Sequence, residues 1–127
     1  MSTSLNELAR QATQAASAGR WQEAESLWKK VLNRAPAHPQ AQSSLGIHAL
    51  QKGDVQGGIR RLESARKAAN DDLFVLMTLC DVYRQTGDSD AERDVIDAAL
   101  TVDAYFAPAL LAKGSWFERA GQASLAA

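Results

Sequence analysis

The chain has 127 residues, of which 46% are hydrophobic and 23% charged, and its formal net charge at pH 7 is −1. This composition is typical of a soluble globular domain, and it argues against disorder, which needs fewer apolar residues and a higher net charge. The absence of a basic excess argues against a nucleic-acid-binding protein, and the single cysteine, Cys80, excludes an internal disulfide framework.

The N-terminal residues lack the basic start and apolar core of a secretory signal. Elsewhere in the chain no apolar run approaches the roughly 18 residues that a membrane span needs. From these two observations we expect a cytoplasmic protein that does not enter a membrane.

Four glycines divide the chain at a fixed interval of 34 residues: Gly19, Gly53, Gly87 and Gly121. Other positions repeat in register with them. Seven residues before each glycine the side chain is small, at Ala12, Gly46, Cys80 and Gly114. A period of this length indicates a solenoid of stacked supersecondary units. We therefore divide the chain into repeats 5–38, 39–72 and 73–106 and a partial repeat 107–127.

The first repeat sets the pattern of two helices around a glycine turn. Apolar residues recur at spacings of three and four, which is typical of helices, and no segment alternates with a period of two. Gly19 is expected to end the first helix in the left-handed conformation. Pro36 and Pro39 are expected to stop the second helix.

The second and third repeats follow the same pattern. Asp54 and Asp88 come directly after the turn glycines, where an aspartate caps the next helix. Small residues five positions after the turn, Ala24 and Gly58, are expected to let the two helices of a repeat approach closely. Glu92 occupies this position in the third repeat, which brings the local packing there into question.

In the last repeat we expect Gly121 to open a turn and residues 122–127 to begin a second helix. Because solenoids usually finish with a capping helix of polar outer face, we expect the chain to be a part of a longer protein or to be covered by a partner. The uncovered helix would present Leu110, Trp116 and Phe117, and these residues predict a homodimer through the open end.

The repeat resembles the tetratricopeptide repeat, whose 34-residue signature combines Trp, Leu-Gly, Tyr, Ala, Phe and Pro at fixed positions. The matching residues are Ala24, Trp28 and Pro36, then Leu45 and Gly46, then Leu79, Tyr83 and Ile96. The resemblance covers almost the whole chain. It implies an all-α, right-handed superhelix of about three and a half helix-turn-helix repeats.

The same resemblance implies a non-catalytic scaffold whose first helices line a concave groove for a peptide or a partner helix. It places in this groove Ala9, Thr13, Ser43, Ile47, Leu50, Phe74, Met77, Asp81, Leu111 and Ser115. The lysines and asparagines that clamp a C-terminal carboxylate in one subfamily are absent from the matching positions. Phe74 and Met77 are the expected apolar anchors. The alternatives are an empty groove or a groove filled by a downstream segment of the same protein.

A narrower resemblance extends over residues 87–119, with Gly87-Asp88-Ser89-Asp90-Ala91-Glu92 as its first run. This stretch is similar to repeats that precede the catalytic domain in bacterial proteins of the aspartyl/asparaginyl β-hydroxylase type. It implies the alternative function of a module that positions substrate for an iron- and 2-oxoglutarate-dependent domain beyond Ala127.

No catalytic, metal-binding or cofactor-binding constellation is expected in this chain. His38 and His48 are separated and read as surface and helix-face residues, and His48 has no evident orienting carboxylate beside it. Cys80 occupies a small core position, so we expect a buried, inert thiol. No cofactor is predicted.

Trp21 and Trp28 are both expected in the core, although tryptophans also stack on bases or sugars. Charge is uneven, since residues 1–70 carry a balance of +5 and residues 71–127 a balance of −6. Solvated outer faces explain this best. Head-to-tail association and nucleic-acid binding to the basic half are the alternatives, and nucleic acid is not the expected partner.

Overall fold

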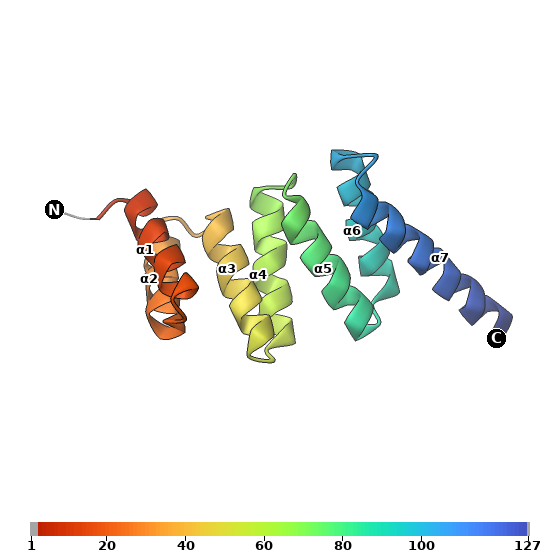
Figure 1. Ribbon diagram of the computed structural model, residues 1–127, viewed down its shortest axis with the longest axis horizontal. Helices are drawn as coiled ribbons and strands as arrows, with labels where there is room; N and C mark the ends of the chain where they lie inside the picture. Colours follow the sequence, from red (N-terminus) through yellow and green to blue (C-terminus); the bar gives the residue numbers. More distant parts are fainter. Residues whose placement is uncertain (1–2, 127) are drawn as a thin grey trace. The chain divides into compact units, whose positions relative to one another are not determined.

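The computed structural model describes residues 3–126, and within them the chain forms helices joined by short turns (Figure 1). They are α1 (Leu5–Ser17), α2 (Trp21–Arg34), α3 (Pro39–Gln51), α4 (Val55–Ala68), α5 (Leu73–Thr86), α6 (Ser89–Val102) and α7 (Ala107–Ala126). The odd-numbered helices begin 34 residues apart. No strand occurs in this part of the chain, and the expectation of an all-α helical repeat is confirmed.

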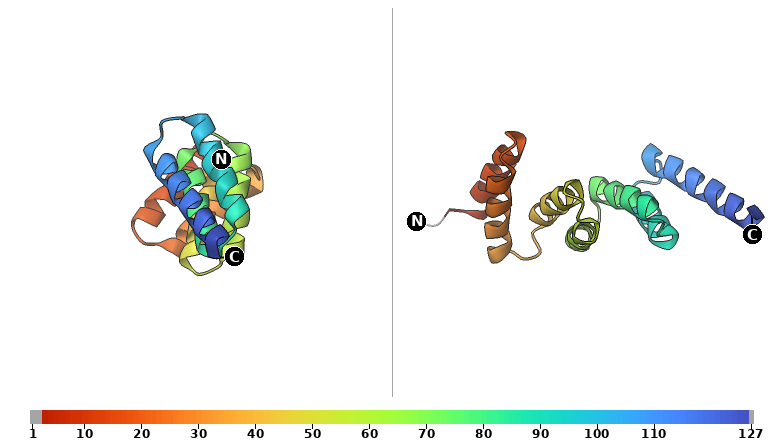
Figure 2. Two further views of the ribbon diagram at one scale, coloured as in Figure 1. Left: turned by 90° about the vertical axis from the view of Figure 1, so that its right-hand side faces the viewer. Right: turned by 90° about the horizontal axis from the view of Figure 1, so that it is seen from below.

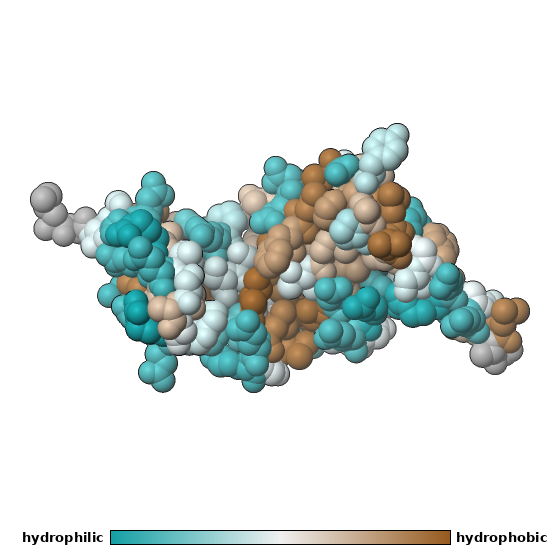
Figure 3. Space-filling model, in the orientation of Figure 1, coloured by the Kyte–Doolittle hydropathy of each residue, from teal (hydrophilic) through white to brown (hydrophobic). Residues whose placement is uncertain are grey.

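The helices belong to two compact units, Met1–Asn70 with α1–α4 and Asp71–Ala127 with α5–α7. In each unit, consecutive helices of a repeat lie side by side as antiparallel hairpins, which the two views of Figure 2 show. The boundary between the units coincides with the change from basic to acidic composition. Over α1 the face in Figure 3 is largely hydrophilic, whereas apolar side chains gather over α5.

Three of the four periodic glycines make the turns that the sequence predicts. Gly19, Gly53 and Gly87 have φ angles of +79°, +88° and +79°, which side chains other than glycine rarely adopt. The aspartates after the second and third glycines act as predicted. Asp54 Oδ1 accepts a hydrogen bond from the Gly57 amide at 3.0 Å, and Asp88 Oδ1 accepts one from the Ala91 amide at 3.2 Å.

Pro39 does not stop α2, as its position suggested, but is the first residue of α3. Its fixed φ suits the first helical position, where no amide hydrogen is needed. Helix α2 ends at Arg34, and the His38 side chain caps α3 by accepting a hydrogen bond at Nδ1 from the Ala41 amide at 3.2 Å.

Close contact between the helices of a repeat depends on the small residues. A Cβ atom added to Gly46 in α3 would lie 3.0 Å from Leu62 Cγ and 3.2 Å from the Gly58 carbonyl oxygen in α4. Ala12 and Ala24, the equivalent pair in the first repeat, are fully buried. In the first two repeats the backbones of each hairpin therefore approach through positions that hold no bulky side chain.

The expected turn at Gly121 is wrong, because α7 continues without interruption from Ala107 through Gly121 to Ala126. A glycine inside a helix costs only about 1 kcal/mol relative to alanine, so a turn needs a second helix to pack back and stabilise it. The residues after Gly121 are mostly alanine, serine and leucine, which also support helix propagation.

Glu92 shows how the third repeat accommodates a glutamate at a small-residue position. Its side chain is buried in α6, and its carboxylate accepts hydrogen bonds from Arg119 of α7 at 3.0 and 2.5 Å. The ion pair raises the pKa of the Arg119 guanidinium through its hydrogen bonds with Glu92. Repeat packing is therefore maintained here by a bidentate ion pair between two helices.

Candidate functional site

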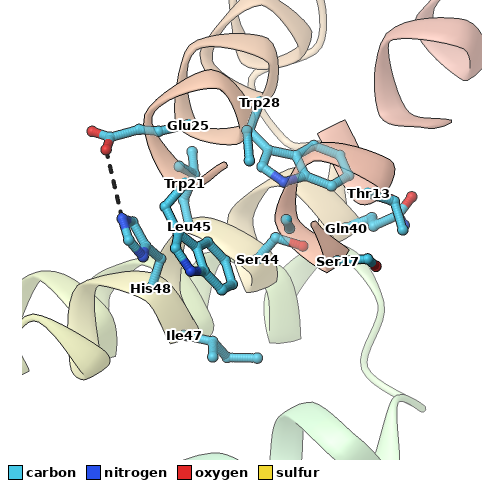
Figure 4. Close-up of a pocket in the computed structure, with 12 residues that line it drawn as sticks. Thr13, Ser17, Trp21, Glu25, Trp28, Gln40, Ser44, Leu45, Ile47 and His48 are labelled. Atoms are coloured by element: carbon cyan, nitrogen blue, oxygen red, sulfur yellow. Dashed lines mark ion pairs between the residues drawn. The ribbon is translucent and has the colours of Figure 1, made fainter. Parts of the chain in front are cut away.

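A cavity of about 230 Å³ lies in the first unit between α1, α2 and α3 (Figure 4). We call it the inter-repeat cavity. Its lining residues are Thr13, Ala16 and Ser17 of α1, then Trp21, Ala24, Glu25 and Trp28 of α2, and Gln40, Ser44, Leu45, Ile47 and His48 of α3. Most of the exposed surface of the wall is apolar, although half of the lining residues have polar side chains. This composition is typical of a ligand site.

Trp21 and His48 form one wall of the inter-repeat cavity by stacking face to face. The ring centroids are 5.0 Å apart and the planes differ by 9°. Trp21 remains 40% exposed, while Trp28 is buried. The stack holds the indole of α2 against α3 and leaves part of it accessible to a ligand.

Glu25 lies near the outer edge of the imidazole. Its Oε2 atom lies 3.7 Å from His48 Nε2, and its two oxygens also lie 3.0 Å from Lys29 Nζ and 3.7 Å from Lys52 Nζ. The hydrogen bond with Lys29, supported by the charges of Lys29, Lys52 and His48, lowers the pKa of the Glu25 carboxyl group. The carboxylate is therefore ionised and already surrounded by cations.

Two expectations about these residues are wrong. Trp21 is exposed, so only Trp28 of the pair belongs to the core. His48 does have a carboxylate beside it, because α2 and α3 pack and bring Glu25 near it. Trp21 and Glu25 lie four residues apart on one face of a helix, and this spacing was the available signal. His48, the third residue of this group, could not be predicted to join Trp21 and Glu25, because it is more than 20 residues away in the sequence.

The first unit holds five of the residues expected in the groove. Thr13 and Ile47 occupy equivalent repeat positions, and both line the inter-repeat cavity. Ala9 is buried, and Thr13 Oγ1 donates a hydrogen bond to its carbonyl oxygen at 2.9 Å. Ser43 and Leu50 are half-buried on α3, where Ser43 Oγ donates to the Gln40 carbonyl oxygen at 3.2 Å.

The second unit holds the others. Phe74 is 65% exposed near the start of α5, and Met77 is half-buried one turn later. Asp81 is exposed, with a carboxylate oxygen 3.3 Å from Arg84. Leu111 and Ser115 are exposed on α7. The exposed apolar side chains of this set are therefore on α5 and α7.

The residues expected at the open end differ in environment. Trp116 is half-buried: its Nε1 donates to the Ser89 carbonyl oxygen at 2.9 Å, and Arg93 lies 4.9 Å from its ring centroid. Leu110 and Phe117 are 47% and 50% exposed. Trp116 thus packs on α6, while Leu110 and Phe117 are only half covered, with Arg93 of α6 lying 4.7 Å from the Phe117 ring centroid.

Cys80 is buried, as expected. Burial is the main cause that raises the pKa of its thiol to about 11, and the nearby Glu92 and Asp81 carboxylates raise it further. Within residues 3–126, no three His, Cys, Asp or Glu side chains gather closely enough to hold a metal ion. The helices described there also include none long and apolar enough to cross a membrane.

Known structures with the same arrangement of helices settle the fold. A tetratricopeptide repeat protein from Parabacteroides merdae superposes with a TM-score of 0.80 and 18% sequence identity. The match covers 92% of this chain and 47% of the Parabacteroides chain. The Arabidopsis OM64 TPR domain superposes with a TM-score of 0.72 and 10% sequence identity. The match covers 88% of this chain and 93% of the OM64 domain. The chain has the tetratricopeptide-repeat fold.

The sequence comparison agrees over part of the chain. Human tetratricopeptide repeat protein 34 is 39% identical over 61 residues, which are 48% of this chain and 11% of the human protein. No family model matches the sequence. This chain therefore spans about a tenth of that curated relative and about half of the Parabacteroides protein.

Proposed function

We propose that the chain is a non-catalytic protein-interaction module that binds a peptide or a partner helix along its odd-numbered helices. The observation that carries this proposal is the exposure of Phe74, at 65%, and Leu111, at 75%, on α5 and α7. Apolar side chains that are exposed, rather than packed in the core of their own unit, are available to contact a partner. The resemblance of the repeat to tetratricopeptide proteins supports the same reading.

The proposed binding residues are those predicted from the sequence. They are Thr13, Ser43, Ile47 and Leu50 in the first unit and Phe74, Met77, Asp81, Leu111 and Ser115 in the second. Phe74 and Met77 are the anchors, since an aromatic ring and a flexible thioether adapt well to apolar partners. Asp81 disfavours a partner carboxylate at its own position.

Peptides selected from a random phage-displayed library against the whole chain test this proposal. We expect Phe74→Asp to weaken the binding of selected peptides at least about tenfold, because it places a charge where an anchor inserts. Tyr105→Asp is the matched control, as Tyr105 is an 88% exposed aromatic residue of the same unit that is not among the proposed binding residues. Equal affinities of both variants and the native chain would place binding elsewhere.

An alternative function is that of a module in an aspartyl/asparaginyl β-hydroxylase-type enzyme, where it would position substrate for a catalytic domain. The resemblance of residues 87–119 to the repeats of such proteins supports it. The test is 2-oxoglutarate turnover by the native full-length protein. Succinate formation in the presence of iron(II) would favour this alternative. If no succinate forms, the interaction scaffold remains as the proposed function.

Self-association through α7 is a further part of the proposal. In the first and third repeats the face equivalent to Leu110, Gly114 and Phe117 is buried: Leu8, Ala12 and Ala15 in α1, and Leu76, Cys80 and Tyr83 in α5. On α7, Leu110 and Phe117 are about half exposed, and a Cβ added to Gly114 or Gly121 would meet nothing within 4 Å. The face that packs within the repeat in α1 and α5 is therefore only partly covered on α7, where Arg93 lies 4.7 Å from the Phe117 ring centroid.

Size complementarity favours a second copy as the occupant of this face. If two α7 helices pack antiparallel about Ser115 and Trp116, Leu110 lies opposite Gly121 of the other copy. Phe117 then lies opposite Gly114 of that copy. In both contacts a large side chain packs against a glycine, as close helix packing requires.

Sedimentation equilibrium tests this dimer. We expect the native chain and Tyr105→Asp to dimerise and Phe117→Asp to sediment as a monomer, since the charge would lie in an apolar contact. A native chain that stays monomeric at its highest soluble concentration would contradict self-association. Dimerisation that survives Phe117→Asp would place the contact on another surface.

A further inference from the structure

We infer that the inter-repeat cavity takes an uncharged, bulky apolar side chain, aromatic or branched aliphatic, from a bound partner peptide. This inference rests on the proposed function, since it identifies one anchor of the proposed partner. It concerns the first unit alone, where the cavity residues Thr13 and Ile47 are among the proposed binding residues.

The size of the cavity fits such a group. Apolar cavities of about 150 Å³ in proteins bind benzene and otherwise stay dry. The inter-repeat cavity, at about 230 Å³, is larger and therefore has room for an indole or a substituted phenyl ring. A small side chain such as alanine would leave most of the apolar wall unfilled and would contribute little binding free energy.

The wall offers both flat and aliphatic surfaces. Trp28 and Leu45 are buried residues that contribute to the wall, while Trp21 and Ile47 are partly accessible. Figure 4 shows both indoles near Ser44, with the Trp28 ring above it and the Trp21 ring to its left. Because the stack on His48 already orders Trp21, a ligand would lose little free energy in fixing that ring.

The charges around the cavity favour an uncharged ligand. Glu25 is the one lining residue that carries a full charge at neutral pH apart from the titratable His48. A cationic side chain would have to compete with Lys29 and Lys52, which already lie 3.0 and 3.7 Å from the Glu25 carboxylate. The negative charge of Glu25 at the edge of the cavity would repel an anionic side chain. Both charged classes are therefore disfavoured.

Two-dimensional ¹⁵N–¹H NMR of the native chain, with indole as the probe, tests the cavity directly. We expect indole to shift the Nε1–H resonances of Trp21 and Trp28, with a Kd of about 1 mM for so small a ligand. Trp116 is an internal reference, because it lies in the other unit with its Nε1–H bonded to the Ser89 carbonyl. Unchanged Trp21 and Trp28 resonances, or equal shifts of all three, would overturn the inference.

Blocked tripeptides then separate the ligand classes. We expect Ac-Ala-Trp-Ala-NH₂ to shift the same resonances, and Ac-Ala-Arg-Ala-NH₂ and Ac-Ala-Asp-Ala-NH₂ to leave them unchanged. A stronger response to the arginine peptide would mean that Glu25 selects a cation, and the inference would be wrong.

A cavity-filling variant provides the mutational test. Ser44→Leu places a larger apolar side chain in the cavity, and we expect it to weaken indole binding at least about tenfold. Ser64→Leu is the matched control, because Ser64 is an exposed serine on α4 that does not line the cavity. Should Ser44→Leu fail to fold, nuclear Overhauser effects from indole to the Ile47 methyl groups decide, since they arise when the probe lies in the cavity.

This experiment and the test of the proposed function fail separately. Absent indole binding, together with Phe74-dependent peptide binding, would overturn the cavity inference and leave the proposed function intact. Indole and Trp-tripeptide binding without any selected peptide would contradict the proposed function and support the cavity as an apolar side-chain site.

Discussion

Arg119 of α7 forms a bidentate ion pair with the buried carboxylate of Glu92 in α6, through hydrogen bonds of 3.0 and 2.5 Å. Glu92 occupies the position where the first two repeats have Ala24 and Gly58. A small residue lets two helices touch, whereas a buried glutamate needs a cation from a neighbouring helix. The arginine that makes Glu92 tolerable therefore also attaches α7 to α6.

We predict that Arg119→Ala destabilises the chain by about 3 kcal/mol, because it leaves a buried carboxylate without its counter-ion. Urea denaturation followed by circular dichroism measures the change. The double variant Glu92→Ala/Arg119→Ala is the matched control and should recover most of the loss, since alanine already occupies this position in the first repeat. A double variant less stable than Arg119→Ala would show that the ion pair does not explain the loss.

The helical glycines should respond to alanine in opposite directions. Gly46→Ala is predicted to destabilise by about 1–2 kcal/mol, since its Cβ would lie 3.0 Å from Leu62 Cγ and 3.2 Å from a backbone oxygen. Gly114→Ala meets open space on α7 and should stabilise by about 0.5–1 kcal/mol through helix propensity. The two midpoints of urea unfolding give the comparison. Equal shifts would contradict the close approach of α3 and α4.

Cys80 should resist alkylation. With its pKa raised to about 11 from a reference of 9.0, the thiol at pH 8 holds about 100-fold less thiolate than an unperturbed cysteine, and burial slows access further. Iodoacetamide labelling at pH 8, followed by mass spectrometry, should therefore be at least about 100-fold slower than for free cysteine. Urea should abolish the protection. Rapid labelling of the native chain would mean that Cys80 is accessible.

Removal of a helix-capping side chain should lower the stability of the chain modestly. Asp54→Ala removes the side-chain acceptor for the Gly57 amide and should destabilise by about 1 kcal/mol. Asp71→Ala, which alters an exposed aspartate outside the helices, should change the free energy of unfolding by less than about 0.5 kcal/mol. Thermal unfolding of both variants checks the pair, and identical midpoints would remove the cap as a source of stability.

Local rules account for most of the fold. The 34-residue interval predicted the repeat, and helices begin at that interval at Leu5, Pro39, Leu73 and Ala107. Gly19, Gly53 and Gly87 turn as predicted because glycine adopts positive φ without a steric penalty. Gly121 shows the limit of the rule: glycine permits a turn, but the turn forms only where a following helix packs back, and here α7 continues instead.

The candidate site followed from sequence only in part. The resemblance to the tetratricopeptide repeat placed Thr13 and Ile47 in the groove, and both line the cavity. Trp21, Glu25 and His48 could not be grouped in this way, because α3 follows in the next repeat and their contact depends on how the two repeats pack. The exposure of Trp21 also depends on how the two repeats pack. The repeat position predicts on which face of α2 the side chain lies, but not how much of it a neighbouring helix covers.

The sequence by itself thus determined the repeat interval, the turns at Gly19, Gly53 and Gly87, the Asp54 and Asp88 caps and the small-residue contacts of the first two hairpins, because these depend on residues close in the chain. Tertiary structure alone decided that Glu92 would pair with Arg119, that His48 would stack on Trp21, and that a cavity would remain beside them. These relationships join different repeats, and they depend on helix packing that a periodic pattern leaves free to vary.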